Sequence, residues 1–412
     1  MKILHINNLS SGSIINQVIY PLVKALEMQG CNNYVFTPDV LKQGGWRNWV
    51  LFFAVKLKLI VEKTLRKLIT NNDYYFYNIF EKVTLISSEM LFRKYGKIDM
   101  IVLYWTSGII NAKTIHKLSV KTGARIFIYP MDMGPLAGGC HYKWDCNGFK
   151  TNCTNCPGLK KPFKFIAVSN LTYRSKYLSR IDVGLLLGTT DLMRDFTESM
   201  IFKDHGCNYL PLGIDGRKYR PSNTRDSYES KKSLLIGAST PLERRKGMAI
   251  LKEALLLLQK DCDLCETVEL VIIGNRADDF FSDLAFHKKY LGFIGETELI
   301  SSYQECYCFV SASIEDAGPM MVNQALICGK PVVAFEVGVA KDLVVDGSTG
   351  FLAKSKNAVS LRDALKKMLN LSVNEYEEMC FKARNNTIEL YEVERVASKL
   401  LNIMKNGGIR VK

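Results

Sequence analysis

Short apolar runs of strand length recur along the chain, and most are followed by a turn and a segment with apolar residues every three or four positions. The first run is Lys2–Ile6, and the spacing after it predicts a helix over Ile14–Met28. Asp73–Lys94, which is rich in aromatic residues, also predicts a helix, whereas Asp99–Tyr104 and Arg125–Tyr129 predict buried strands. Alternating strands and helices indicate parallel sheets of the α/β class.

A second series of strands and helices begins at Ser233–Ile236, and one part of it has the features of a ligand site. A strand at Cys308–Val310 runs into a loop with two carboxylates. A helix follows over Met320–Cys328, and Val332–Phe335 predicts the next buried strand. Because ligands of open α/β sheets bind beyond the carboxyl ends of the strands, the loop with the two carboxylates is the predicted site.

The length of the chain predicts two domains, since 412 residues exceed what one hydrophobic core usually holds. The polar and charged stretch 216–232 has the composition of a linker. We therefore expect an N-terminal domain over 1–215, a C-terminal domain over 233–392, and a last helix within 393–412.

The chain is basic, with 55 Lys and Arg, 41 Asp and Glu, and a net charge of +14. This balance favours nucleic acid, an anionic membrane face or phosphorylated small molecules as partners. The segment 46–69 joins basic residues to bulky aliphatic side chains and two tryptophans, as interfacial membrane helices do. The alternative is a helix packed on the N-terminal sheet with a solvated basic face. The interleaved aliphatic residues disfavour nucleic acid as the partner.

The expected location is cytoplasmic. No uncharged apolar run reaches the ~20 residues of a spanning helix, and the first residues lack the regions of a signal peptide. Together with the basic segment, these features predict a protein held peripherally on the inner face of the cytoplasmic membrane, with an anionic membrane surface as its partner.

Four of the twelve cysteines are clustered, at Cys140, Cys146, Cys153 and Cys156. Four thiolates within so short a stretch can close a tetrahedral zinc site with a structural role, and the final Cys-x-x-Cys is a usual chelating turn. His141 could replace one cysteine. Two disulfides or four buried thiols are the alternatives.

The stretch 311–350 resembles the nucleotide-sugar site of the retaining family-4 (group 1) glycosyltransferases, which have the GT-B fold. The family's Cys-Gly-x-Pro-Val-Val frame is matched by Cys328–Val333. With this frame aligned, Asp316 and Gln324 occupy the positions of the family's two glutamates. Both residues keep oxygen acceptors for sugar or ribose hydroxyls, although Gln324 carries no charge.

The resemblance also extends to the groups that bind the donor diphosphate. Lys246 matches the family's lysine, whereas Ala238 stands at the family's arginine, so Arg244 or Arg245 is expected to supply the second cation. The alternative is a solvated basic turn.

Residues 130–159 resemble a branch of the same family that is involved in exopolysaccharide and colanic-acid-type assembly. In that branch a strand is followed by His-Asp, then by Gly-Gly-Cys-His-Tyr and spaced cysteines. Asp132 matches the aspartate and Gly138–Tyr142 matches the second motif, whereas Met131 stands at the histidine. His141 is a weaker candidate than Asp132 for the polar role at this place.

The resemblance implies two Rossmann-like doubly wound domains that face a cleft, and transfer from a UDP- or GDP-sugar to a hydroxyl of a saccharide acceptor. It implies a lipid-linked acceptor and a role in surface polysaccharide biosynthesis, as for capsule or lipopolysaccharide. A catalytic divalent metal is not expected, because basic groups neutralise the leaving diphosphate. The implied catalytic residues are Asp132, Lys246 and Asp316. The implied donor-binding residues are Gly12, Ser13, Arg244, Arg245, Lys246, Glu315, Asp316, Gly318, Pro319, Met320, Gln324 and Gly338.

Two other interpretations remain open on the sequence. Gly12 and Ser13 form either a donor-facing loop or a plain tight turn. The departures at Met131 and Gln324 favour, as a rival function, a catalytically degenerate protein that binds sugar or acts as a scaffold. A nucleotide-binding oxidoreductase is disfavoured, because the chain lacks the glycine fingerprint GxGxxG.

Overall fold

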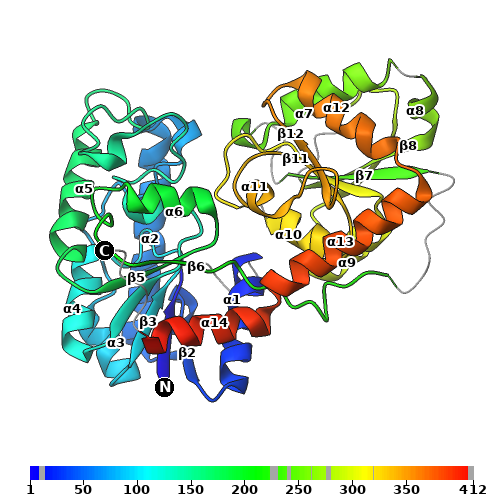
Figure 1. Ribbon diagram of the computed structural model, residues 1–412. Coiled ribbons are helices and arrows are strands. Elements are labelled where there is room, and N and C mark those ends of the chain that lie inside the picture. The colour runs from blue at the N-terminus through cyan, green and yellow to red at the C-terminus, as the bar shows by residue number, and fades with distance from the viewer. Residues whose placement is uncertain are drawn as a thin grey trace. The chain divides into compact units, whose positions relative to one another are not determined.

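The computed structural model describes residues 1–8, 14–222, 231–238, 243–260, 262–274, 280–318 and 320–406 (Figure 1). The chain divides into two compact units. The N-terminal unit comprises Met1–Gly213 and the segment from Val396 onward, and the C-terminal unit comprises Ile214–Arg395.

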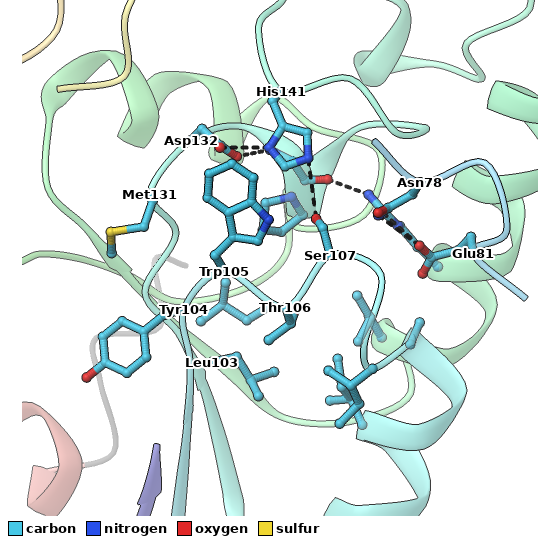
Figure 2. Close-up of a pocket in the computed structure, with 18 residues that line it drawn as sticks. Asn78, Glu81, Leu103, Tyr104, Trp105, Thr106, Ser107, Met131, Asp132 and His141 are labelled. Carbon is cyan, nitrogen blue, oxygen red and sulfur yellow. Dashed lines mark hydrogen bonds and ion pairs between the residues drawn. The ribbon is translucent and has the colours of Figure 1, made fainter. Parts of the chain in front are cut away.

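The N-terminal unit is built on a sheet of six strands in the order β2-β1-β3-β4-β5-β6. All neighbouring strands are parallel. The strands are β1 (Lys2–Ile6), β2 (Asn32–Phe36), β3 (Met100–Leu103), β4 (Arg125–Ile128), β5 (Val183–Leu187) and β6 (Cys207–Tyr209). The strand order reverses between β1 and β3, which creates a crevice beyond their carboxyl ends. The loops after β3 and β4, next to this crevice, line a pocket (Figure 2).

Helices complete the N-terminal unit, and α3, α4 and α5 pack side by side. Polar caps set several of their starts: the Asn111 side chain accepts a hydrogen bond from the Thr114 amide at the start of α4. The Ser398 hydroxyl of α14 lies 3.2 Å from Oε1 of Gln29, next to the end of α1. The helices are α1 (Ile14–Met28), α2 (Trp46–Ile69), α3 (Ser88–Tyr95), α4 (Ala112–Thr122), α5 (Phe165–Leu178), α6 (Thr190–Thr197) and α14 (Val393–Asn406).

The predicted helix over Asp73–Lys94 is wrong for most of its length, because only α3 at its end is α-helical. Tyr75 has a left-handed backbone with φ +46°, which interrupts any helix. The backbone then pairs with a distant segment: the Tyr77 amide donates to the Gly139 carbonyl (2.9 Å), and the His141 amide donates to the Tyr74 carbonyl (3.1 Å). This long-range pairing cannot be read from local periodicity.

The C-terminal unit repeats the architecture with a parallel sheet of order β12-β11-β10-β7-β8-β9. Its order reverses between β7 and β10, so a second crevice forms beyond the carboxyl ends of those strands. The strands are β7 (Lys232–Ala238), β8 (Val268–Gly274), β9 (His287–Gly292), β10 (Cys308–Ser311), β11 (Val332–Phe335) and β12 (Gly350–Ala353).

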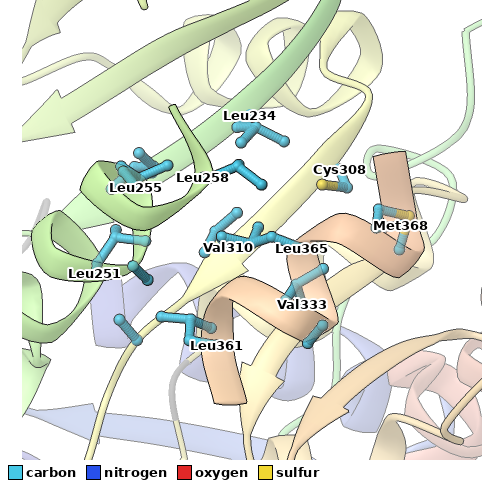
Figure 3. Close-up of a cluster of buried hydrophobic side chains, with 14 of the residues drawn as sticks. Leu234, Leu251, Leu255, Leu258, Cys308, Val310, Val333, Leu361, Leu365 and Met368 are labelled. Carbon is cyan, nitrogen blue, oxygen red and sulfur yellow. The ribbon is translucent and has the colours of Figure 1, made fainter. Parts of the chain in front are cut away.

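Two helices pack against one face of this second sheet and bury its largest apolar cluster (Figure 3). Helix α7 contributes Leu251 and Leu255, and α12 contributes Leu361 and Leu365, all of which are fully buried. The helices of the unit are α7 (Met248–Leu258), α8 (Cys262–Thr267), α9 (Glu296–Glu305), α10 (Met320–Ile327), α11 (Val339–Leu343), α12 (Ala358–Leu369) and α13 (Val373–Tyr391).

Both units confirm the predicted α/β class with parallel, doubly wound sheets. Among the helices within the described ranges, none combines the length and the apolar composition needed to cross a bilayer.

Candidate functional site

The first candidate site lies beyond the carboxyl ends of β7 and β10. The short 3-10 turn η5 (Arg244–Lys246) follows β7, and Asp316 follows β10. One Asp316 oxygen, Oδ2, accepts from Arg245 Nη1 at 2.8 Å and from Lys246 Nζ at 2.7 Å. Burial opposes the charge on Asp316, but Lys246 and Arg245 together outweigh it and hold the pKa of this carboxyl below its usual value. A fixed pair of cations therefore lies at the crevice.

Backbone contacts fix the two loops that carry this cluster. The Ile314 amide donates to the Arg245 carbonyl at 2.8 Å. Gly247 has φ +64°, and a Cβ at this position would lie 1.9 Å from the Ala312 carbonyl oxygen. Only glycine allows this approach, so Gly247 sets the position of Arg245 and of the lysine beside it.

A third loop, from the end of β11, closes against the same place. Gly338 has φ +53°, and a Cβ there would lie 2.9 Å from the Asp316 carbonyl oxygen and 3.1 Å from the Gly318 nitrogen. The Gly318 amide in turn donates to Asp316 Oδ1 at 3.2 Å. The structure therefore brings together Asp316, Gly318, Gly338, Arg245 and Lys246, which are among the residues that the resemblance implies for donor binding.

Gln324 lies elsewhere in the same unit, on the buried side of α10. Its Oε1 accepts from the Tyr303 hydroxyl at 3.0 Å, and its Nε2 donates to the Tyr219 hydroxyl at 3.2 Å. The Tyr219 hydroxyl also donates to Glu296 at 3.1 Å. Both ends of the Gln324 amide are thus engaged by tyrosines that the sequence analysis did not select.

Other predicted donor residues are only partly located. Arg244 is exposed on η5, and Glu315 and Met320 are half-buried beside Asp316 and at the start of α10. Gly12, Ser13 and Pro319 lie outside the residues that the structure describes.

The second candidate site lies in the N-terminal unit and contains Asp132. Asp132 Oδ2 lies 2.7 Å from His141 Nδ1, and His141 Nε2 lies 3.3 Å from the Ser107 hydroxyl (Figure 2). The indole of Trp105 stacks on the His141 ring at 5.0 Å, and the Tyr77 ring meets its edge at 4.7 Å. Asp132 follows β4, and Trp105 and Ser107 follow β3.

These side chains line a pocket of about 50 Å³. Met131 also lines it, so the methionine that stands at the family's histidine faces this pocket, with His141 close by. Trp105 and Ser107 were not predicted as site residues, although their place directly after a buried strand is a signal for such a role.

The four clustered cysteines line a separate cavity of about 180 Å³. All four are free thiols in the structure, which excludes the disulfide alternative there. Burial and the neighbouring thiols raise the pKa of Cys140 well above its usual value. Within the described ranges, no group of three or more His, Cys, Asp or Glu is arranged to hold a metal ion, so the arrangement does not support the predicted zinc site. Cys140, Cys153 and Cys156 are buried thiols, as that alternative describes, whereas Cys146 is half-buried.

Comparison with known proteins gives a family for one part of the chain. Residues 220–388 match the family described as "Glycosyl transferases group 1". Over 204 residues, the chain is 26% identical to the phosphatidyl-myo-inositol mannosyltransferase of Mycobacterium tuberculosis (strain CDC 1551 / Oshkosh), covering 47% of this chain and 52% of that protein. The chain thus spans about half the length of the relatives it matches.

Solved structures agree over nearly the whole chain. The sucrose-phosphate synthase of Thermosynechococcus elongatus aligns with a TM-score of 0.66 and 14% identity, covering 98% of both chains. Anabaena Alr3699/HepE in complex with UDP and glucose aligns with a TM-score of 0.60 and 14% identity, covering 98% of this chain and 99% of that one. The predicted GT-B fold is confirmed, and the residues that match the group 1 glycosyltransferase family lie within the C-terminal unit.

Proposed function

We propose that the protein is a retaining glycosyltransferase that moves a sugar from a nucleoside diphosphate sugar to a hydroxyl of a lipid-linked saccharide, in surface polysaccharide biosynthesis. The observation that carries this proposal is the cation pair Arg245 and Lys246, held by Asp316 beyond β7 and β10 of the group 1 glycosyltransferase domain. The solved structure of Anabaena Alr3699/HepE, similar in fold, holds UDP and glucose.

The chemistry of the cluster suits a leaving diphosphate. A lysine has three N–H donors and an arginine five. Lys246 and Arg245 can therefore keep their hydrogen bonds to Asp316 and still donate to phosphate oxygens. As the bond from the sugar's anomeric carbon to the diphosphate breaks, negative charge grows on the leaving oxygen, where these cations stabilise it. The acceptor oxygen forms the new bond to the same carbon, and its proton passes to the departing phosphate. Under this proposal Asp132 belongs to the acceptor side.

Turnover of the donor tests the enzymatic proposal. We expect the purified protein to release UDP or GDP from one member of a panel of UDP-, GDP- and TDP-sugars, and that donor to raise the melting temperature. If no donor is turned over and none shifts the melting temperature, the enzymatic proposal fails. A shift without turnover would favour the rival function, a degenerate sugar-binding or scaffold protein. Met131 and the hydrogen-bonded amide of Gln324 are the features that support this rival.

The exposed side of α2 supports a membrane location. Eight large apolar side chains of this helix are exposed by at least 41%: Trp46, Trp49, Val50, Phe53, Leu57, Ile60, Val61 and Leu68. Placed at about 100° per residue, they fall within an arc of about 120°, opposite the buried residues Val55, Glu62 and Ile69. A face this apolar on a surface helix marks an interaction site.

The charges around this face favour an anionic lipid surface as the occupant. Lys63 and Lys67 are exposed and Lys56 is half-buried, and all three flank one edge of the apolar arc. The acid of the helix, Glu62, is buried and paired with Lys58 at 3.3 Å. The relative from M. tuberculosis is, by its name, a mannosyltransferase that acts on phosphatidyl-myo-inositol, a lipid. These features support our proposal that the protein acts on the inner face of the cytoplasmic membrane.

Flotation on anionic vesicles tests this location. Each basic residue near such a surface contributes ~1 kcal/mol, so changing Lys56, Lys63 and Lys67 to Glu should weaken binding about a hundredfold or more. The matched control changes three exposed lysines away from α2 to Glu and should bind as the unchanged protein does: Lys97, Lys113 and Lys117. Equal binding of both variants contradicts the proposal.

A further inference from the structure

The pocket of the N-terminal unit has a chemistry that the donor diphosphate does not explain. Its polar centre is the chain Asp132, His141 and Ser107, and its wall includes the Trp105 indole (Figure 2). The one arginine in the lining, Arg174, is already engaged by Glu81 and by two backbone carbonyls. Because the charge of Arg174 is already paired with Glu81, a phosphate here would add negative charge beside the buried carboxylates Asp132 and Glu81, whereas a neutral hydroxyl-bearing ligand would meet no repulsion.

The hydrogen bonds fix which groups face a ligand. In the neutral form of His141, the Nδ1–H donates to Asp132 Oδ2, and Nε2 is left as an acceptor for the Ser107 hydroxyl. The carboxylate is itself fixed, since its Oδ1 accepts from the Gly134 amide at 2.8 Å. Both His141 and Asp132 are at least 95% buried, and Ser107 is half-buried. The Ser107 hydroxyl therefore donates its hydrogen to His141 Nε2, and the lone pairs of its oxygen remain for a hydroxyl of a ligand.

A second acceptor in the lining lacks a partner. Asn78 donates through Nδ2 to Glu81 at 3.0 Å, but its buried Oδ1 has no hydrogen-bond partner among the described residues. A buried polar atom left without a partner costs ~1–3 kcal/mol, so such an atom in a pocket points to a ligand that donates. A ligand hydroxyl supplies that donor.

We propose that this pocket is a subsite for the hydroxyl-bearing edge of one neutral sugar ring. The volume of about 50 Å³ holds a few water-sized groups, which suits ring hydroxyls or a hydroxymethyl group rather than a whole disaccharide. Ser107 and Asn78 bind hydroxyls, and the indole of Trp105 packs on the apolar C–H groups of the ring. This inference rests on the proposed function only in assigning the ring to the acceptor.

Helix α2 supports the wall of this subsite from behind. Lys58 Nζ donates to the Gly108 carbonyl at 2.9 Å, which holds the loop that carries Ser107. The Arg66 guanidinium lies 4.1 Å from the Tyr77 ring centroid, and Tyr77 in turn packs on His141. The buried side of α2 thus braces the subsite while its opposite side is the exposed apolar face. An acceptor whose sugar lies next to a lipid surface suits this arrangement.

Saturation-transfer NMR with a panel of methyl glycosides tests the subsite in the full-length protein. We expect at least one glycoside to bind the unchanged protein, and Ser107→Ala and Trp105→Leu each to weaken its binding tenfold or more. Ser107→Thr, which keeps the hydroxyl, should retain most of the binding. Ser119→Ala removes a hydroxyl at the far end of α4 and should bind as the unchanged protein does.

Kinetics then separate this inference from the proposed function. With an active donor, Ser107→Ala should raise the KM for the acceptor tenfold or more and change the KM for the donor less than threefold. Glycoside binding without any donor turnover would retain the subsite and reject the transferase. Donor turnover with no glycoside bound at millimolar concentration, or with equal binding by the folded Ser107→Ala and Trp105→Leu variants, overturns the subsite.

Discussion

The two units have the same sheet topology and opposite site chemistry. In each, six parallel strands reverse their order next to the first strand; the C-terminal site lies beyond the two strands at that reversal, whereas the N-terminal site lies beyond β3, which borders the reversal, and its neighbour β4. The C-terminal site is ionic, with Arg245 and Lys246 on Asp316, whereas the N-terminal site is an aromatic pocket around the hydrogen-bonded pair Asp132 and His141. Topology therefore decides where each site lies, and the residue types on the loops decide what each can bind.

The largest expected effect comes from removing a cation of the ionic site. Lys246→Ala should lower donor turnover ~10²–10³-fold, because one of the groups that stabilise the leaving diphosphate is lost. Lys246→Arg should retain part of the activity, and Lys252→Ala, which breaks a surface ion pair with Asp283, should have little effect. Steady-state release of the nucleotide measures this. A loss of less than threefold in Lys246→Ala would contradict the ionic role.

One glycine in each unit allows the two units to be perturbed separately. Gly338→Ala places a Cβ 2.9 Å from the Asp316 carbonyl oxygen, and Gly139→Ala, at φ +139°, places one 2.6 Å from the Phe76 ring. Each should destabilise its own unit by ~1–3 kcal/mol. Denaturant unfolding, followed by tryptophan fluorescence, reports only on the N-terminal unit, which holds all four tryptophans.

Fluorescence should therefore shift for Gly139→Ala and not for Gly338→Ala, while donor turnover should fall for Gly338→Ala. Gly295→Ala is the control, because it has φ −73° and no atom within 4 Å of an added Cβ. Equal effects of Gly338→Ala and Gly295→Ala would contradict this prediction, because they would show that the loop around Asp316 shifts to accommodate the added Cβ.

A smaller effect is expected from changing Gln324, whose amide is hydrogen-bonded at both ends. Gln324→Glu restores the family's residue but leaves the Tyr219 hydroxyl facing a buried carboxylate instead of an amide donor. We expect a loss of ~1–3 kcal/mol in the free energy of unfolding. Gln29→Glu, exposed and accepting through the same oxygen, should change it by less than ~0.5 kcal/mol. Thermal unfolding measures both, and a stabilised Gln324→Glu would contradict the buried network.

The smallest expected effect is a change with pH in the free energy of unfolding, and it arises in the N-terminal unit alone. Burial lowers the pKa of His5 to about 4, although the hydrogen bond to Asn33 opposes this. Between pH 6.5 and 4 the unfolded chain binds a proton that the folded chain does not, so stability falls as the pH falls. At pH 5.5 the loss should be ~1 kcal/mol relative to pH 7.5.

Denaturant unfolding by tryptophan fluorescence at the two pH values measures it. His5→Gln should flatten this part of the pH dependence, whereas His287→Gln, exposed in the C-terminal unit, should leave it unchanged. An unaltered slope in His5→Gln would show that other groups titrate in this range.

Local patterns were enough to predict much of the framework. The buried runs of β3 and β4 and the helix over Trp46–Ile69 were predictable, because strand and helix periodicity is a local signal. Asp316 and Lys246 were selected through a resemblance and lie together in the structure. The segment after Asp73 was predicted wrongly, since its backbone pairs with Gly139 and His141 more than sixty residues away.

The sequence by itself determined the α/β class and the basic amphipathic helix, because these depend on residue type and short spacing, and the candidate diphosphate cluster was selected through a resemblance. Only the tertiary structure decided which residues share a site. In the folded chain, Ser107, His141 and Asp132 form one hydrogen-bonded chain, and the Gln324 amide is hydrogen-bonded to two tyrosines. These contacts arise where separate strands and loops end side by side, and that proximity is a property of the packed chain rather than of any local pattern.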